Sequence, residues 1–311
     1  MSNMREIKMR IKSIQDTEQI TKAMKLISAS KLKRARQQLD HALPYFTRVK
    51  STIADILLHS ESVESKFFEK PHEPYKDEDT PANKGDEAKK EGGRAKVGII
   101  VITGDKGLAG GYNHNIIKAA EQLITQTVDP QLFVAGVIGR NYFIKKNFKV
   151  DKDFDYPVQN PTVYRARDIS EIILEKYIYH ELDEVYIVYT ELVNAMRMVT
   201  RQVKLLPVNI EALKEDIGMT EDAHFDDMII YEPSPAAMIE VLIPRYLKGV
   251  IYGALVEAFT SEQNARMAAM DNATSNADEI LNELKLNYNR ARQSAITQEI
   301  SEIVGGTAAL Q

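Results

Sequence analysis

Residues 254–304 read ALVEAFTSEQNARMAAMDNATSNADEILNELKLNYNRARQSAITQEISEIV, a stretch that decides the fold because it contains neither glycine nor proline. At about 1.5 Å per residue it can form a helix of roughly 75 Å. A helix of that length cannot fold back inside a compact domain, so we expect a rod that needs a partner for its apolar side.

The small and apolar residues of this rod recur three or four positions apart and therefore fall on one face. Steps of four outnumber steps of three, so we expect a departure from the repeat of an ideal left-handed supercoil. Alanine dominates the face and lets two helix axes approach closely. The face comprises Leu247, Ile251, Ala254, Ala258, Ala265, Ala269, Ala273, Ala277, Ile280, Leu284, Tyr288, Ala291 and Ala295.

The partner of this rod lies at the other end of the chain, where residues 1–43 also lack glycine and proline. Their apolar and small residues repeat at spacings of three, four or seven, which predicts a long antiparallel coiled coil formed by the N- and C-terminal helices. Pro44 should kink or break the first helix before it ends near Leu58. The repeating residues are Ile7, Ile11, Ile14, Thr21, Met24, Ser28, Leu32, Ala35 and Leu39.

Between the two helices, short β-branched runs alternate with helical patterns. This alternation is typical of a small, mostly parallel, Rossmann-like α/β sandwich whose last strand lies on an edge. We expect strands over 96–103, 132–138, 184–190 and 200–208, and helices over 115–127, 140–147 and 169–181. The predicted organisation is a coiled-coil helix over 1–60, a charged flexible linker or insertion over 61–95, an α/β foot domain over 96–208, a connection over 209–242 and a coiled-coil helix over 243–311.

Composition limits the possible functions. The chain has no cysteine, which excludes disulfides and thiol catalysis. No apolar run approaches the roughly 18 residues of a membrane span, and the N-terminus lacks the features of a secretory signal, so we expect a soluble, intracellular chain. The net charge is −5, although residues 1–36 hold ten Lys and Arg against three Asp and Glu.

The turn GDKGLAGGYN at 104–113 follows the first expected strand, where doubly wound folds bind nucleotide phosphates. Its glycines fit neither G-x-G-x-x-G nor G-x-x-x-x-G-K-[ST], and Asp105 would repel a phosphate. We interpret this stretch as a tight strand-to-helix turn that needs positive φ. A nucleotide site on a free-standing α/β enzyme is the alternative.

Other candidate sites are weak. The six histidines show no metal-ligand spacing, and no serine or threonine has the context of a nucleophile. We therefore expect no catalytic, cofactor-binding or metal-binding residue. The basic stripe of Lys31, Lys33, Arg34 and Arg36 could bind nucleic acid or an anionic membrane. Because no aromatic residues alternate with it, a solvated face or a face that meets acidic loops of a protein partner fits better.

Four segments resemble the gamma-subunit family of F-type ATP synthases, bacterial type. They are ITKAMKLISASKL at 20–32, the turn at 104–113, SEQNARMAAM at 261–270 and YNRARQSAITQEI at 288–300. The resemblance covers nearly the whole chain except about 65–95. It implies a non-catalytic central-stalk rotor that turns inside a ring of three alpha and three beta subunits. Its rotation would couple proton flow to ATP synthesis or hydrolysis and regulate ATPase activity.

The same resemblance implies the partners and the contact residues. The partners are the alpha and beta subunits, the epsilon subunit and the membrane c-ring, with no nucleic acid, no cofactor and no membrane insertion. The chain would be peripheral, at the cytoplasmic face of the bacterial membrane. Without the resemblance, each contact residue would be an ordinary polar coiled-coil position. The residues that would face the ring are Met24 and Lys25 at a coupling segment, Glu262 and Arg266 near it, and Arg292, Gln293 and Thr297 at the loops of the ring.

Overall fold

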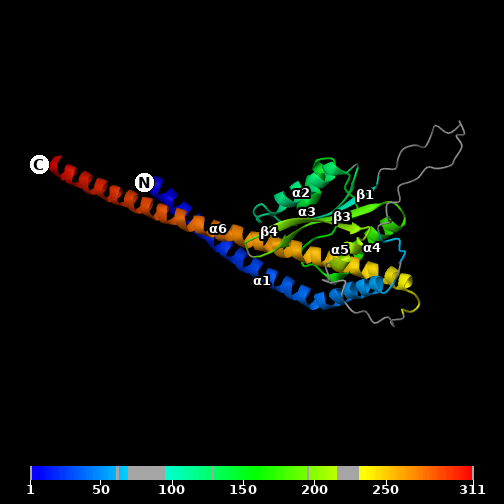
Figure 1. The fold of residues 1–311 in the computed structure, drawn as a ribbon. Coiled ribbons are helices and arrows are strands. Elements are labelled where there is room, and N and C mark those ends of the chain that lie inside the picture. The colour runs from blue at the N-terminus through cyan, green and yellow to red at the C-terminus, as the bar shows by residue number, and fades with distance from the viewer. Residues whose placement is uncertain are drawn as a thin grey trace, which may run out of the picture. The chain divides into compact units, whose positions relative to one another are not determined.

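The computed structural model describes residues 2–60, 63–68, 95–127, 129–194, 196–215 and 231–309 (Figure 1). The predicted linker over 61–95 lies mostly outside these residues. The chain forms two units. The coiled-coil unit comprises Met1–Leu32, Leu108–Gly110 and Gln263–Gln311, and the α/β unit comprises Lys33–Gly107 and Gly111–Glu262. Within the part of the chain that the structure describes, no helix is long and apolar enough to cross a membrane.

Ten elements follow one another along the described part of the chain. Two long helices enclose an α/β segment in the sequence, as predicted. The elements are α1 (Ser2–Leu58), β1 (Val97–Ile102), α2 (Tyr112–Gln126), β2 (Gln131–Ala135), α3 (Val137–Lys145), α4 (Val163–Ile178), β3 (Glu184–Leu192), β4 (Met198–Leu206), α5 (Ile210–Glu215) and α6 (Pro235–Ala309).

The four strands of the α/β unit form one sheet in the order β2-β1-β3-β4. The inner strand β1 pairs in parallel with both neighbours, so that Val101 lies opposite Val134 on one side and Val188 on the other. The edge strand β4 runs antiparallel to β3. The prediction of a mostly parallel sheet with its last strand on an edge is therefore confirmed.

Alternate residues of the strands face the two sides of the sheet, as the period of two requires. On one side, Ile100, Phe133 and Ile187 belong to a core that includes residues of α1, α4 and α6. Helices α2 and α3 contact the strands from the other side (Figure 1). The sheet is thus covered by helices on both faces, which explains why its parallel strands read as continuous apolar runs.

Several element boundaries differ from the prediction, and α4 begins at Val163 rather than at 169. Two of the differences arise at glycine and proline. The strand expected over 132–138 ends at Ala135, since Gly136 has a φ of 94° and α3 begins directly after it. Helix α6 begins at Pro235 rather than at 243, and Pro244 lies inside it. Proline is favourable at the first position of a helix, where its missing amide would be unpaired in any case. The amide of Ala237 also donates to the hydroxyl of Ser234.

Helix α1 is one helix through Pro44, which does not break it. The second half of α1 bends (Figure 1), as expected for a proline that removes one backbone hydrogen bond.

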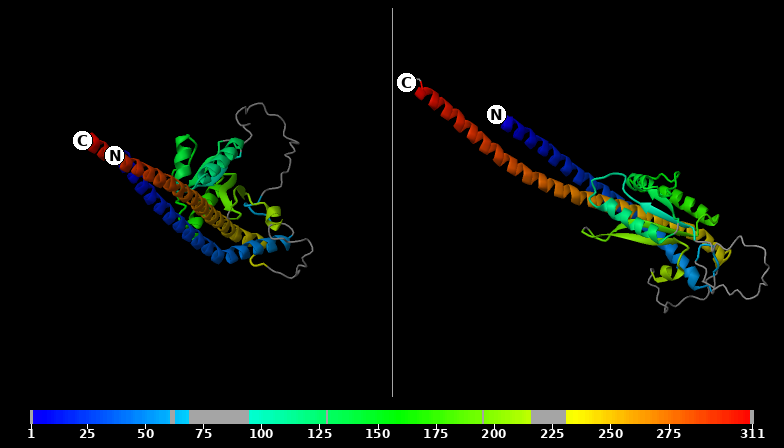
Figure 2. Two further views of the ribbon diagram at one scale, coloured as in Figure 1. Left: turned by 90° about the vertical axis from the view of Figure 1, so that its left-hand side faces the viewer. Right: turned by 90° about the horizontal axis from the view of Figure 1, so that it is seen from above.

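In the coiled-coil unit, α1 and α6 run side by side in opposite directions (Figure 2). All the repeating positions predicted on α1 are buried or half-buried. On α6 the buried and half-buried positions Met270, Thr274, Ala277, Leu281 and Leu284 alternate steps of four and three. This is a heptad repeat, and the predicted positions Ala265, Ala269, Ala273 and Ala277, spaced by four, are also buried or half-buried.

Ile280 was expected on the buried face of α6, and this prediction is also wrong. Its side chain is 43% exposed, and Leu281 is buried instead. Both residues are apolar and both satisfy a spacing of three or four from Ala277, so the sequence pattern could not separate them.

Candidate functional site

The glycine-rich turn begins at the carboxyl end of β1. The chain passes from β1 to β2 on one side and later to β3 on the other. In open α/β sheets such a change of direction creates the crevice in which ligands bind. The turn has the positive φ that we predicted, at Gly110 (54°) and also at Leu108 (61°).

The carboxylate of Asp105 accepts hydrogen bonds from backbone amides at this end of the sheet. Its Oδ2 accepts hydrogen bonds from the amides of Val158 (2.9 Å) and Gln159 (3.1 Å). Its Oδ1 accepts from the amide of Val137 (3.3 Å), the first residue of α3. A bound phosphate would use amides of this kind, and a side-chain carboxylate of the protein takes its place.

The next two amides of α3 are also bonded to the end of β1. The amide of Ile138 donates to the carbonyl of Gly104 (3.2 Å), and that of Gly139 donates to the hydroxyl of Thr103 (3.0 Å). The approach is so close that a Cβ on Gly139 would lie 2.5 Å from Thr103 Cγ2. The N-terminus of α3 is therefore bonded to the protein itself.

A second carboxylate lies against the turn from α6. A Cβ on Gly104 would lie 3.1 Å from Glu262 Cδ, and the side chain of Glu262 is only 2% exposed. The amide of Gly104 donates to Asn113 Oδ1 (2.8 Å). The carboxylates of Asp105 and Glu262 and the amide oxygen of Asn113 thus lie at the turn, which favours a structural role over a site for an anionic nucleotide. The described residues also contain no group of His, Cys, Asp or Glu that could hold a metal ion.

The coiled-coil unit carries a polar layer inside its seam. The hydroxyls of Thr21 and Thr274 lie 2.7 Å apart and are buried. Thr21 can also donate to the carbonyl of Glu18 (2.9 Å), and Thr274 to that of Met270 (2.8 Å). One turn further along α1, Lys25 Nζ lies 2.5 Å from Asp271 Oδ1. These contacts join the two helices at one level of the unit.

The seven predicted contact residues lie at three kinds of position. Met24 and Lys25 are half-buried on α1, and Lys25 is held by Asp271. Glu262 and Arg266 are buried, which the sequence pattern did not indicate. The remaining three, Arg292, Gln293 and Thr297, are exposed on α6. Their role in binding a partner stays a prediction.

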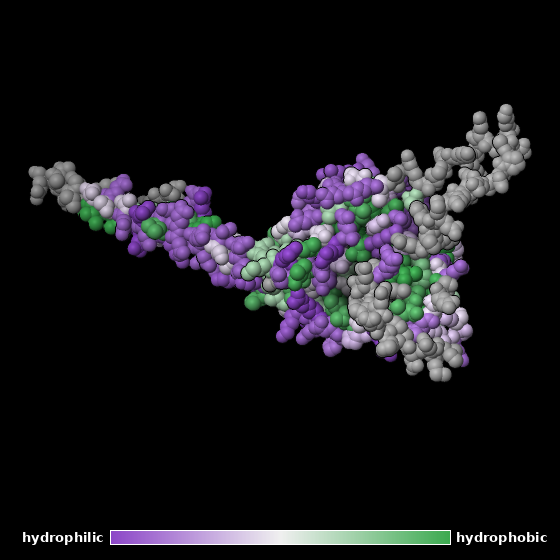
Figure 3. All heavy atoms as spheres, in the orientation of Figure 1, coloured by the Kyte–Doolittle hydropathy of each residue, from purple (hydrophilic) through white to green (hydrophobic). Residues whose placement is uncertain are grey.

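The surface of the coiled-coil unit also exposes large apolar side chains, which the sequence reasoning missed. Leu26 is 71% exposed and stands beside exposed Ile27 on α1. Figure 3 shows hydrophobic patches that interrupt the otherwise hydrophilic surface of this unit. In the sequence, these residues can be recognised as apolar residues outside the heptad positions. Exposed hydrophobic patches of this kind mark surfaces that bind a partner. The other members are Met9, Ile20, Ile280, Leu286, Ile296, Ile300 and Ile303.

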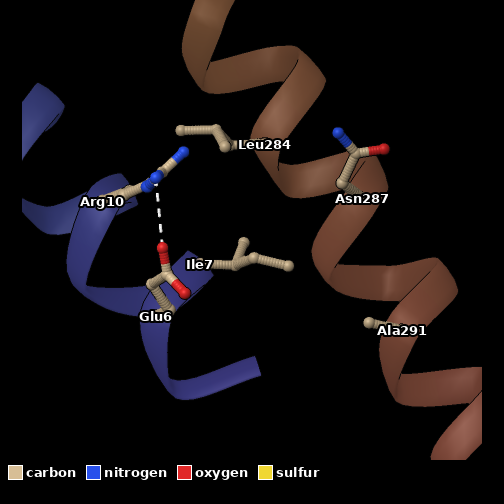
Figure 4. Close-up of a pocket in the computed structure, with 6 residues that line it drawn as sticks. All are labelled: Glu6, Ile7, Arg10, Leu284, Asn287 and Ala291. Atoms are coloured by element: carbon tan, nitrogen blue, oxygen red, sulfur yellow. Dashed lines mark ion pairs between the residues drawn. The ribbon is translucent and has the colours of Figure 1, made fainter. Parts of the chain in front are cut away.

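A hollow lies between the start of α1 and the facing part of α6 (Figure 4). On its α1 side, Arg10 Nη2 lies 3.1 Å from Glu6 Oε1. Its lining contains no Ser, Thr, Cys, Lys or His side chain that could act as a nucleophile beside a base. The lining residues are Glu6, Ile7, Arg10, Leu284, Asn287 and Ala291.

Known proteins resemble this chain over its whole length. The family model described as ATP synthase matches residues 3–310. The ATP synthase gamma chain of Ruminiclostridium cellulolyticum is 57% identical over 311 residues, covering 100% of this chain and 99% of the relative. That of Acetivibrio thermocellus is 51% identical over 313 residues, covering 100% of both.

A solved structure shares the fold. In the cryo-EM structure of Euglena gracilis mitochondrial ATP synthase, OSCP/F1/c-ring, rotational state 3, one chain superposes with a TM-score of 0.63 at 17% sequence identity. The match covers 99% of this chain and 95% of that chain.

Proposed function

The chain belongs to the ATP synthase gamma-chain family, and from this premise we propose that it is the central-stalk rotor subunit of a bacterial F-type ATP synthase. It carries no catalytic site itself. Its rotation inside a ring of three alpha and three beta subunits couples proton flow to ATP synthesis and hydrolysis, and regulates ATPase activity.

The observation that best supports this proposal is the combination of a closed seam with an apolar outer surface. Heptad packing of α1 against α6 satisfies the inner faces of both helices. The outer apolar residues such as Leu26 and Ile27 remain exposed. A coiled coil that acted only as a spacer would need polar residues there, whereas one enclosed by a ring of subunits would need apolar ones.

A single asymmetric rod can act differently on three identical sites around it. At each angle it presents a different face to each beta subunit and favours the open or closed state of that subunit. Rotation would then change nucleotide affinity as a shift of populations, since the rod contributes different contact free energies to the two states.

The contact residues of this rod are the seven named from the sequence. Met24 and Lys25 would face the beta subunits, and Glu262 and Arg266 would lie near them. Arg292, Gln293 and Thr297 would meet loops of the ring, and their exposure on α6 leaves them accessible. The basic stripe, of which Lys33, Arg34 and Arg36 are exposed, would meet acidic loops.

The α/β unit would be the foot of the rotor, in contact with the epsilon subunit and the c-ring. The chain would then be a peripheral protein at the cytoplasmic face of the membrane. This location agrees with the absence of a membrane-spanning helix among the described residues.

Co-expression with alpha and beta subunits from the same source tests the proposal. We expect one copy of this chain in a large complex that hydrolyses ATP, while the purified chain alone neither hydrolyses nor binds a nucleotide. A chain that stays outside the complex, or that binds ATP by itself, would overturn the proposal and return attention to the turn at 104–113.

A further inference from the structure

The α/β unit encloses one stretch of α6 almost completely. From Ala254 to Glu262, every side chain except that of Glu257 is buried. The contacts come from the core that also contains residues of the sheet, α1 and α4. Most of this burial is apolar, as for Leu255 and Phe259. This stretch of α6 is therefore packed against the α/β unit on several sides rather than on one face only.

Three hydrogen bonds join this stretch of α6 to the strand–helix part of the α/β unit. The phenol of Tyr112, the first residue of α2, donates to the carbonyl of Ala258 (2.9 Å). The hydroxyl of Ser261 donates to the carbonyl of Thr190 on β3 (2.9 Å). The bonds of Tyr112 and Ser261 are both buried.

The third hydrogen bond runs from the end of β3 to the same side of α6. The amide of Leu192 donates to Glu257 Oε2 (3.2 Å). Positions 257, 258 and 261 lie within little more than one helical turn, so the three bonds act on one side of α6. Their partners come from two elements, α2 and β3, which makes the attachment resist rotation of α6 about its own axis.

Apolar packing alone would not fix that rotation well. Hydrophobic burial is roughly proportional to area and has no preferred direction, so a small turn of the helix exchanges one apolar contact for another. A hydrogen bond weakens steeply when its angle or length changes. The three bonds therefore define the rotational angle of α6 within the α/β unit more sharply than the apolar contacts do.

The chain topology makes such an attachment important. The α/β segment is inserted between α1 and α6, so it is joined covalently to the two helices only at its two ends. Any torque applied to the sheet and its covering helices must reach α6 through noncovalent contacts as well as through these two connections.

We propose that Tyr112, Glu257 and Ser261 form a torque clasp, a set of positioning residues that fixes the angle of α6 in the α/β unit and passes rotation from the foot to the shaft. This inference rests on the proposed rotor function. The clasp touches neither nucleotide nor the transported ion, and it acts by keeping the foot and the shaft in one angular relation under load.

The test uses the complete ATP synthase in lipid vesicles, with ATP hydrolysis and proton uptake measured on the same preparation. The test variant is Tyr112→Phe with Ser261→Ala. The matched control is Tyr142→Phe with Ser170→Ala. Tyr142 donates to Glu121 Oε1 (2.9 Å) within the α/β unit, and buried Ser170 donates to Arg167 within α4 (2.8 Å). The control thus removes the same two kinds of hydroxyl group, but from hydrogen bonds that do not involve α6.

We expect the test variant to keep hydrolysis within about twofold of the parent while protons pumped per ATP fall severalfold, most strongly against an opposing gradient. The control variant should keep the parental ratio. An unchanged ratio in the test variant, or an equal loss in the control, would overturn the clasp. If the parental chain supports no ATP-driven proton uptake at all, the rotor function itself fails.

Glu257 supplies a second arm that does not depend on the double variant assembling. Glu257→Gln keeps an oxygen that can accept from Leu192 and should retain the parental ratio. Glu257→Leu removes that acceptor and should lower the ratio. Equal ratios in the two variants would contradict the role of this residue.

Discussion

The coiled coil contains two buried threonines that can be replaced singly and together. We expect the changes in the free energy of unfolding of the two single variants not to add up to that of the double variant. The hydroxyls of Thr21 and Thr274 lie 2.7 Å apart, and each also lies within hydrogen-bonding distance of a carbonyl on its own helix. Each hydroxyl has one hydrogen, so only two of these three bonds form at once. Of the three ways to form two bonds, two keep the bond between the helices, and the 2.7 Å separation of the hydroxyl oxygens favours these two.

The expected magnitudes follow from this geometry. Thr21→Val leaves Thr274 able to donate to Met270, but the bond across the seam is lost at a cost of about 1 kcal/mol. Thr274→Val should cost about the same, for the same reason. In the double variant two methyl groups replace two hydroxyls of the same shape, and the net change should be near zero. The coupling free energy is then about 2 kcal/mol in magnitude.

Urea unfolding of the full chain, followed by circular dichroism, measures these differences. Thr17→Val is the matched control, because Thr17 makes the same kind of bond to Ser13 (2.9 Å) but is exposed and has no partner on α6. We expect the control to stay within about 0.5 kcal/mol of the parent. Additive changes, with the double variant about 2 kcal/mol less stable, would refute the shared hydrogen bond.

Three further predictions concern α1, α6 and pH. Gly253→Ala meets no atom within 4 Å and should stabilise α6 by up to about 1 kcal/mol. Gly249→Ala would place a Cβ 2.4 Å from Phe46 Cδ1 and should destabilise the chain by about 1–2 kcal/mol in thermal unfolding. If both glycine variants changed the stability in the same direction, the packing described here would be contradicted. Met24→Lys should leave assembly intact but lower the ratio of proton pumping to hydrolysis, because the added cation would form a fixed contact with the ring; an equal ratio would speak against that contact. Burial raises the pKa of Glu257, and the hydrogen bond from the amide of Leu192 offsets this rise only in part. Ionisation of Glu257 is therefore less favourable in the folded chain than in the unfolded chain, so the contribution of this group to stability falls as pH rises through its raised pKa. Glu257→Gln should therefore raise the melting temperature at neutral pH and lose that advantage in acid, and a pH-independent difference would disprove this cause.

Much of the fold could be predicted because long stretches without glycine or proline allow few alternatives. Residues 1–43 and 254–304 had to be helices, and the apolar residues of α1 recur at positions that the structure buries or half-buries. The β-branched runs likewise identified the strands of a sheet covered on both sides. These predictions rest on periodicity, which short stretches of sequence express directly.

The remaining errors come from residues whose role depends on their surroundings. Pro235 begins a helix, whereas Pro244 lies inside the same helix, and the residue type alone does not separate these cases. Ile280 and Leu281 both fit the spacing of the seam, and the structure buries Leu281 and exposes Ile280. Sequence spacing cannot resolve such choices, because they are made by packing between distant segments.

The candidate site shows the same division. The departure of the glycines from nucleotide-binding spacing already favoured a structural turn. The identity of the groups that fill the crevice was not predictable, because Asp105 bonds to amides more than fifty residues away and Glu262 comes from the other end of the chain. The contact residues were predicted only from the resemblance to a family. The sequence did not indicate that Glu262 and Arg266 are buried, which the structure shows.

The most direct test of the central claim is to observe rotation of this chain in a single assembled complex. The chain has no cysteine, so Lys118→Cys on an exposed position of α2 gives one attachment point in a complex whose other subunits lack accessible thiols. With the ring fixed to a surface, a bead on that residue should rotate in one direction when ATP is added, with one pause for each beta subunit. ATP hydrolysis while the bead keeps a fixed angle would contradict the rotor account.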